Sequence, residues 1–141
     1  MKKYITSLFV ISFLFAGCSK DDDDDKNCDL NNTNIVGVYK TTAVTYKATP
    51  GSPEEDDFST WAPCEKDDLI VFNDNGTGNL QDAGVKCAPP GDDTFTWSLT
   101  GNIHTIDGFI ASTVTSFDCS TMKIKLTDPT GGVTVTTVVR Q

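Results

Sequence analysis

The chain has 141 residues and a formal charge of −9, from 20 acidic residues against 11 lysines and arginines. This acidic balance excludes nucleic acid as a natural partner, because binding to phosphate requires positive charge. The length allows one small domain with a limited hydrophobic core, so cross-links are expected to contribute to its stability.

The first 17 residues have the three parts of a secretory signal peptide. Lys2 and Lys3 precede an apolar stretch over residues 4–15, and small residues follow. This stretch is shorter than the ~20 residues that a permanent membrane span needs. Residues 14–18, Leu-Phe-Ala-Gly-Cys, resemble the lipobox of bacterial lipoproteins. We therefore expect residues 1–17 to be removed and Cys18 to carry lipid, palmitate included, that anchors the chain to a membrane. The alternative is an ordinary signal peptide with an incidental cysteine.

Residues 18–33 are predicted to form a solvated spacer, because Asp21–Asp25 are five like charges with no apolar content. With the signal peptide removed, 9 basic and 20 acidic residues remain, a formal charge of −11. The acidic run resembles the surface-export signal of Bacteroidota lipoproteins, which implies an outer-membrane protein facing the cell exterior. Residues 22–26 also spell an enterokinase site of the kind used in expression tags, but the intact signal peptide before them argues against that origin.

Four cysteines remain after Cys18, an even number that favours two disulfides in an oxidising compartment. The Asn75-Gly76 pair predicts a two-residue hairpin turn, which would pair positions whose numbers sum to 151. Cys64 and Cys87 satisfy that sum, and this leaves Cys28 to pair with Cys119. The alternative is a zinc site, but no two potential ligands are closely spaced and His104 is the only histidine.

Residues 34–141 are predicted to form one all-β domain, because two-residue alternation recurs and helical periodicity does not. Phe95, Trp97 and Leu99 alternate with polar residues and should face the interior. Eight short antiparallel strands in sequence suit a small up-and-down barrel, with a two-sheet sandwich as the alternative. The predicted strands are 35–46, 68–73, 77–81, 94–100, 103–106, 109–117, 122–126 and 133–140. The residues predicted to face inward are Phe72, Phe95, Trp97, Leu99, Met122, Ile124 and Leu126.

The domain resembles the lipocalin-like domain family of Bacteroidota surface lipoproteins. The residues that carry the resemblance are the opening Ile-Val-Gly-Val-Tyr at 35–39, the Cys64 segment leading to Phe72, the turn at 72–77, Cys87, and Thr-Trp-Ser-Leu-Thr-Gly at 96–101. The resemblance implies a barrel that holds a small hydrophobic molecule in its mouth. Lipocalins usually have Trp where Tyr39 stands, and in them that aromatic packs under a late arginine. We therefore predict a barrel-closing cation–π contact between Tyr39 and Arg140.

The segment 49–63 is the most unusual part of the domain, since three prolines and two aromatics occupy a long connection. We predict that its Phe58 and Trp61 line a ligand pocket together with the interior Phe95 and Trp97; the alternative for each is packing alone. The acids at 54–57, with Asp92 and Asp93, could supply calcium ligands, but no spacing matches a calcium loop. We therefore expect neither a metal nor a cofactor.

No constellation of nucleophile, base and orienting acid surrounds His104, so we expect the protein not to be an enzyme. Two functions remain. The first is a membrane-anchored protein that binds a small hydrophobic ligand at the cell surface. The second is a protein-interaction module or accessory subunit with a filled barrel.

Overall fold

The computed structural model describes residues 28–141, so the predicted signal peptide, Cys18 and most of the acidic spacer lie outside the described residues. The described part is almost entirely β-structure. Its elements are β1 (Gly37–Lys47), β2 (Glu55–Asp56), a 3-10 helix η1 (Phe58–Thr60), α1 (Pro63–Lys66), β3 (Leu69–Phe72), β4 (Thr77–Gln81), β5 (Asp93–Thr100), β6 (Ile103–Ile106), β7 (Ile110–Phe117), β8 (Thr121–Thr127) and β9 (Val133–Arg140). Within residues 28–141, no helix has the length and apolar content to cross a bilayer.

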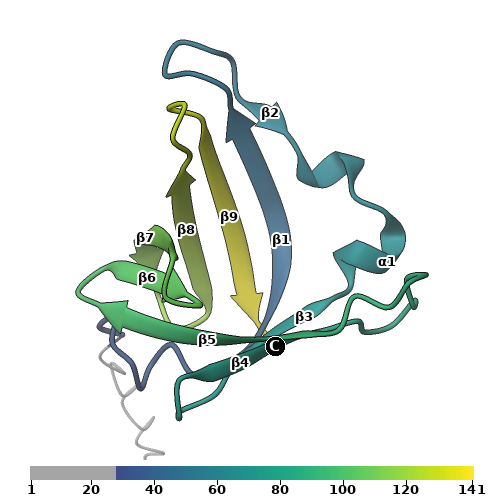
Figure 1. Ribbon diagram of the computed structural model, residues 1–141, viewed down its shortest axis with the longest axis vertical. Helices are drawn as coiled ribbons and strands as arrows, with labels where there is room; N and C mark the ends of the chain where they lie inside the picture. Colours follow the sequence, from purple (N-terminus) through teal and green to yellow (C-terminus); the bar gives the residue numbers. More distant parts are fainter. Residues whose placement is uncertain (1–27) are drawn as a thin grey trace, which may run out of the picture.

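The strands form one closed antiparallel barrel. From β3 to β9 each strand pairs with the next, β1 pairs with β3, and β9 returns to pair with β1 along most of its length. Closure satisfies the edges that an open sheet would expose. The predicted eight-strand barrel is confirmed, and the sandwich is not formed. The two-residue β2, on the outer edge of β1, is additional to the eight (Figure 1).

The turn between β3 and β4 differs from the prediction. The pairs run from Leu69 with Gln81 to Phe72 with Gly78, so paired positions sum to 150 and not 151. The loop has three residues, because Gly76 alone adopts positive φ (79°) while Asn75 uses its side chain to accept hydrogen bonds from Thr77. This is a type I turn completed by a glycine bulge, a common alternative to the two-residue turn.

The connection between β1 and β3 forms a lid, defined here as residues 48–68. One edge of β1 pairs with β9. The other edge pairs with β3 over Gly37–Lys40 and, farther along, only with β2. The lid lies beside the edge that β3 leaves open, and the Asp57 amide donates to the Val44 carbonyl at 3.0 Å. Figure 1 shows β2, η1 and α1 in succession along this side of the barrel.

Phe72 lies at the centre of a core of aromatic rings. Its ring centroid lies 5.8 Å from that of Tyr39, 5.7 Å from Phe95, 5.5 Å from Trp97 and 5.3 Å from His104, all edge to face. Such pairs each add about 0.5–1.5 kcal/mol beyond the burial of their area. The interior around Phe72 is therefore filled by side chains. The remaining buried apolar residues are Ile35, Val44, Leu99, Val114, Met122 and Val138.

Two of the expectations for apolar residues need correction. Leu126 faces inward by alternation, yet its side chain is exposed, because β8 ends nearby at the open rim of the barrel. Ile35 lies before β1 and not in it, and it is fully buried in the core with Tyr39 and Phe72.

Candidate functional site

The interior of the barrel has a pocket of about 260 Å³ at its open end. Three of its walls come from neighbouring strands: Thr41 on β1, Ile70 on β3 and Leu80 on β4, the last two being direct cross-strand partners. The lid supplies the rest of the lining, with Trp61, Glu65 and Asp68. Most of this surface is apolar, with carboxylates contributed by the lid.

One covalent link joins the lid to the β4–β5 loop, and two contacts inside the lid hold its own side chains together. A disulfide joins Cys64 on α1 to Cys87 in the β4–β5 loop. The rings of Phe58 and Trp61 pack together, with their centroids 5.3 Å apart. Lys66 lies 5.4 Å from the centre of the Phe58 ring and donates to the Ser59 carbonyl. These contacts hold Phe58 and Trp61 against each other, and Trp61 lines the pocket.

The structure does not bring the four predicted ligand-binding aromatics together. Trp97 is 7% exposed and packs on Phe72, and its indole N–H donates to the carbonyls of Asn73 (3.1 Å) and Thr77 (2.9 Å). Phe95 packs on Phe72 and lies against the bare backbone of Gly78, where a Cβ would be 2.3 Å from its ring. Of the four, only Trp61 lines the open-end pocket.

The two carboxylates of the pocket are only partly satisfied by the protein. Glu65 accepts from the Ala62 amide at 2.7 Å, and Asp68 accepts from the Ala83 amide at 3.3 Å. Burial raises the pKa of Asp68 above its usual range, opposed by the Ala83 hydrogen bond and reinforced by the nearby carboxylates of Asp82, Asp67 and Asp92. The pocket therefore has a negative side.

His104 lies inside the barrel, away from this pocket. It is 2% exposed, and its Nε2 has no hydrogen-bond partner within the described residues. Burial lowers the pKa of His104, which favours the neutral ring that packs against Phe72.

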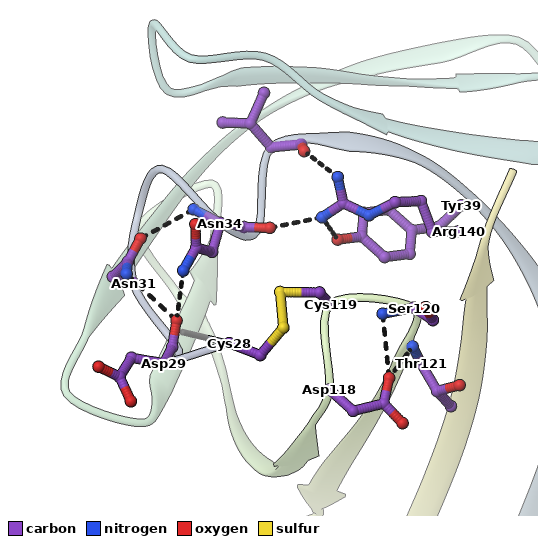
Figure 2. The surroundings of a disulfide bond; sticks show 11 residues. Cys28, Asp29, Asn31, Asn34, Tyr39, Asp118, Cys119, Ser120, Thr121 and Arg140 are labelled. Atoms are coloured by element: carbon purple, nitrogen blue, oxygen red, sulfur yellow. Dashed lines mark hydrogen bonds between the residues drawn. A yellow bond between two sulfur atoms is a disulfide. The ribbon is translucent and has the colours of Figure 1, made fainter. Parts of the chain in front are cut away.

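At the opposite end of the barrel, Arg140 lies between Tyr39 and the N-terminal arm, as Figure 2 shows. The guanidinium lies 5.1 Å from the centre of the Tyr39 ring, and it donates to the Tyr39 hydroxyl at 2.6 Å. It also donates to the carbonyls of Val36 at 2.9 Å and of Asn34. The structure thus places the two residues of the predicted barrel-closing contact together.

The arm itself is held by the second disulfide, between Cys28 and Cys119 in the β7–β8 turn (Figure 2). Asn31 caps a turn of the arm by accepting from the amides of Thr33 and Asn34. Both disulfides join the cysteines in the predicted pairs. Cys64 and Cys87 are not cross-strand partners in the hairpin, however, because both lie beyond the ends of β3 and β4.

Among residues 28–141, no group of three or more histidine, cysteine or acidic side chains is arranged to hold a metal ion. The acids at 54–57 are instead exposed on the lid, where Glu54 pairs with Lys47 at 3.3 Å.

An up-and-down barrel that is sealed at one end and has a lidded pocket at the other belongs to the class of small barrels that can hold one small molecule in the mouth. The comparisons give the particular family. The profile of the lipocalin-like domain matches residues 35–128, more than half of the chain, and the chain belongs to that family. No curated protein matches the sequence.

Sequence reasoning missed most of the pocket lining. Ile70 could have been found, because alternation places it on the same face as Phe72, and Leu80 follows once the hairpin is paired. Glu65 and Asp68 lie outside the strands, so alternation could not place them in the pocket. Their position depends on the path of the lid across the barrel mouth.

Proposed function

We propose that this protein is a lipid-anchored outer-membrane lipoprotein that binds a small hydrophobic ligand in the open-end pocket and does not act as an enzyme. The observation that carries the proposal is the pocket itself, about 260 Å³ bounded by Trp61, Ile70 and Leu80 at the mouth of a lipocalin-like barrel. Its volume is just below the roughly 300–1,000 Å³ of typical small-molecule sites. The ligand is therefore small.

The tether supports an orientation for this pocket. Cys18 and Cys28 are ten positions apart, which allows a reach of at most about 33–36 Å when extended. Cys28 is bonded to Cys119 at the sealed end of the barrel. With lipid on Cys18, the sealed end faces the membrane and the mouth is free to take its ligand from the surrounding medium.

The ligand proposal is tested with a neutral fluorescent probe, N-phenyl-1-naphthylamine, titrated into the purified full-length protein. We expect saturable binding that Trp61→Ala weakens by about tenfold, as loss of an aromatic contact worth about 1.4 kcal/mol predicts. Phe109→Ala is the matched control, because Phe109 is 77% exposed and outside the pocket. Absence of saturable binding, or equal loss in both variants, would refute the pocket and favour the interaction module.

The anchor is tested separately by feeding cells labelled palmitate. We expect Cys18→Ala to lose the label and to leave the outer-membrane fraction. Labelling that persists in this variant would contradict the lipobox prediction. Protease digestion of intact cells then tests whether the domain faces the exterior.

A further inference from the structure

The open-end pocket has an apolar wall and an anionic side. Ile70 and Leu80 form the apolar wall on the barrel, whereas Glu65 and Asp68 bring carboxylates from the lid. Each carboxylate makes one hydrogen bond to a backbone amide of the described chain, through Glu65 Oε2 and Asp68 Oδ1. The second oxygen of each is available to accept from a bound molecule.

The charge on this side of the pocket is not balanced by the protein. No lysine or arginine of residues 28–141 lines the pocket. Lys66, on the same helix as Glu65, is committed to the Phe58 ring and the Ser59 carbonyl. Lys86 in the facing loop donates to the Asp82 carbonyl. The carboxylates of Asp67, Asp82 and Asp92 add like charge around Asp68, whose pKa is raised first by burial and then by these neighbours. A cation entering here is attracted by groups that the fold leaves without a counter-ion.

Trp61 adds a second feature that favours a cation. An indole face attracts ammonium and guanidinium groups through its quadrupole, by more than other aromatic rings do. Trp61 lines the same pocket as the two carboxylates. The pocket therefore combines an aromatic wall, hydrogen-bond acceptors and negative charge, which are the elements of an ammonium site, with an apolar wall beside them.

We propose that the ligand is a small amphiphilic cation, with an ammonium or guanidinium group on an apolar body. The cation lies between Glu65 and Asp68, against the Trp61 ring. The apolar body lies on Ile70 and Leu80. This inference rests on the proposed binding function and names the ligand class of the same site.

The test uses three soluble compounds with one phenyl body and different charge: phenethylamine, 2-phenylethanol and 3-phenylpropionate. Affinities for the full-length protein in detergent are measured by isothermal titration calorimetry. We expect the amine to bind at least about tenfold more tightly than the alcohol, since charge-assisted hydrogen bonds are about twice as strong as neutral ones. The acid should bind most weakly, because like charges repel it.

Asp68→Asn is the informative variant, because the amide oxygen can still accept from Ala83 while the charge is lost. We expect it to reduce the preference for the amine over the alcohol to about threefold or less, with unchanged binding of the alcohol. Glu55→Gln is the matched control, an exposed carboxylate on β2 outside the pocket, and it should keep the full preference. Thermal unfolding of both variants checks that the fold is retained.

The outcomes separate this inference from the function on which it rests. If the alcohol or the acid binds as tightly as the amine, or if Asp68→Asn leaves the preference intact, the cationic ligand is refuted and the binding function stands. If the naphthylamine probe binds but no phenyl compound does, the ligand class is equally refuted. If neither the probe nor any phenyl compound binds, the proposed function fails.

Discussion

Replacing Arg140 by methionine removes the guanidinium that seals the barrel and keeps much of its apolar stem. The carbonyls of Val36 and Asn34 and the hydroxyl of Tyr39 lose their donor, and the Tyr39 ring loses its cation. An unsatisfied buried acceptor costs about 1–3 kcal/mol, and a cation–π contact is worth about 0.5–2 kcal/mol. In the native protein, Arg140 Nε is itself buried without a partner among the described residues. Removing this unsatisfied donor offsets part of the stability that the substitution loses. We therefore expect a loss near the lower end of the combined range, about 3–4 kcal/mol.

Urea unfolding followed by tryptophan fluorescence, with both disulfides intact, measures this loss. Tyr39→Phe removes only the hydroxyl and should cost about 1 kcal/mol. Because the two side chains contact each other, the double variant should be more stable than additivity predicts, by at least about 0.5 kcal/mol. Lys125→Met is the control, an exposed cation on β8, and should change stability by less than about 0.5 kcal/mol. A loss below about 1 kcal/mol in Arg140→Met, or strict additivity with Tyr39→Phe, would refute the role of the contact.

Two further predictions concern a buried histidine and the lid. Because burial lowers the pKa of His104, the unfolded chain binds a proton more readily there, and stability should fall as pH drops below the unfolded value of about 6.5. His104→Phe should flatten the stability profile between about pH 7 and 5, and an unchanged slope in urea titrations would contradict this. Replacing Cys64 and Cys87 by serine opens a link between positions 23 residues apart, and we expect a loss of about 3 kcal/mol. The double serine variant should also be cut faster by protease within residues 48–68. An unchanged urea-unfolding midpoint together with an unchanged cleavage rate would contradict a stabilising role for the disulfide.

The arrangement of strands was predictable because alternation and turn residues act locally. Phe95, Trp97 and Leu99 alternate with polar residues, and in β5 the last two are buried. The partnership of Tyr39 and Arg140 came from a family resemblance and not from spacing, since 101 positions separate them. Alternation along one strand identifies which of its side chains face inward. It does not identify which distant residues contact each other, and for Tyr39 and Arg140 that information came from the family resemblance.

The errors have a common physical origin, because alternation says nothing of depth or of exact register. Leu126 has the correct face but lies at the open rim, where an inward side chain still meets solvent. Asn75 and Gly76 do mark the turn, but Asn75 bonds to Thr77 through its side chain and the loop gains a residue. Trp61 lines the pocket, whereas Trp97 packs in the core. Alternation cannot tell the two ends of a barrel interior apart.

The filled core also decides how the pocket can vary. The rings around Phe72 occupy the interior towards the sealed end, so the open-end pocket is confined to the mouth of the barrel. Moving those rings would break buried contacts, whereas η1 and α1 contain no buried residue. Local opening is least costly where few apolar contacts are lost. If the proposed function holds, we therefore expect a larger ligand to displace the lid about its Cys64 attachment and to leave the barrel beneath it unchanged.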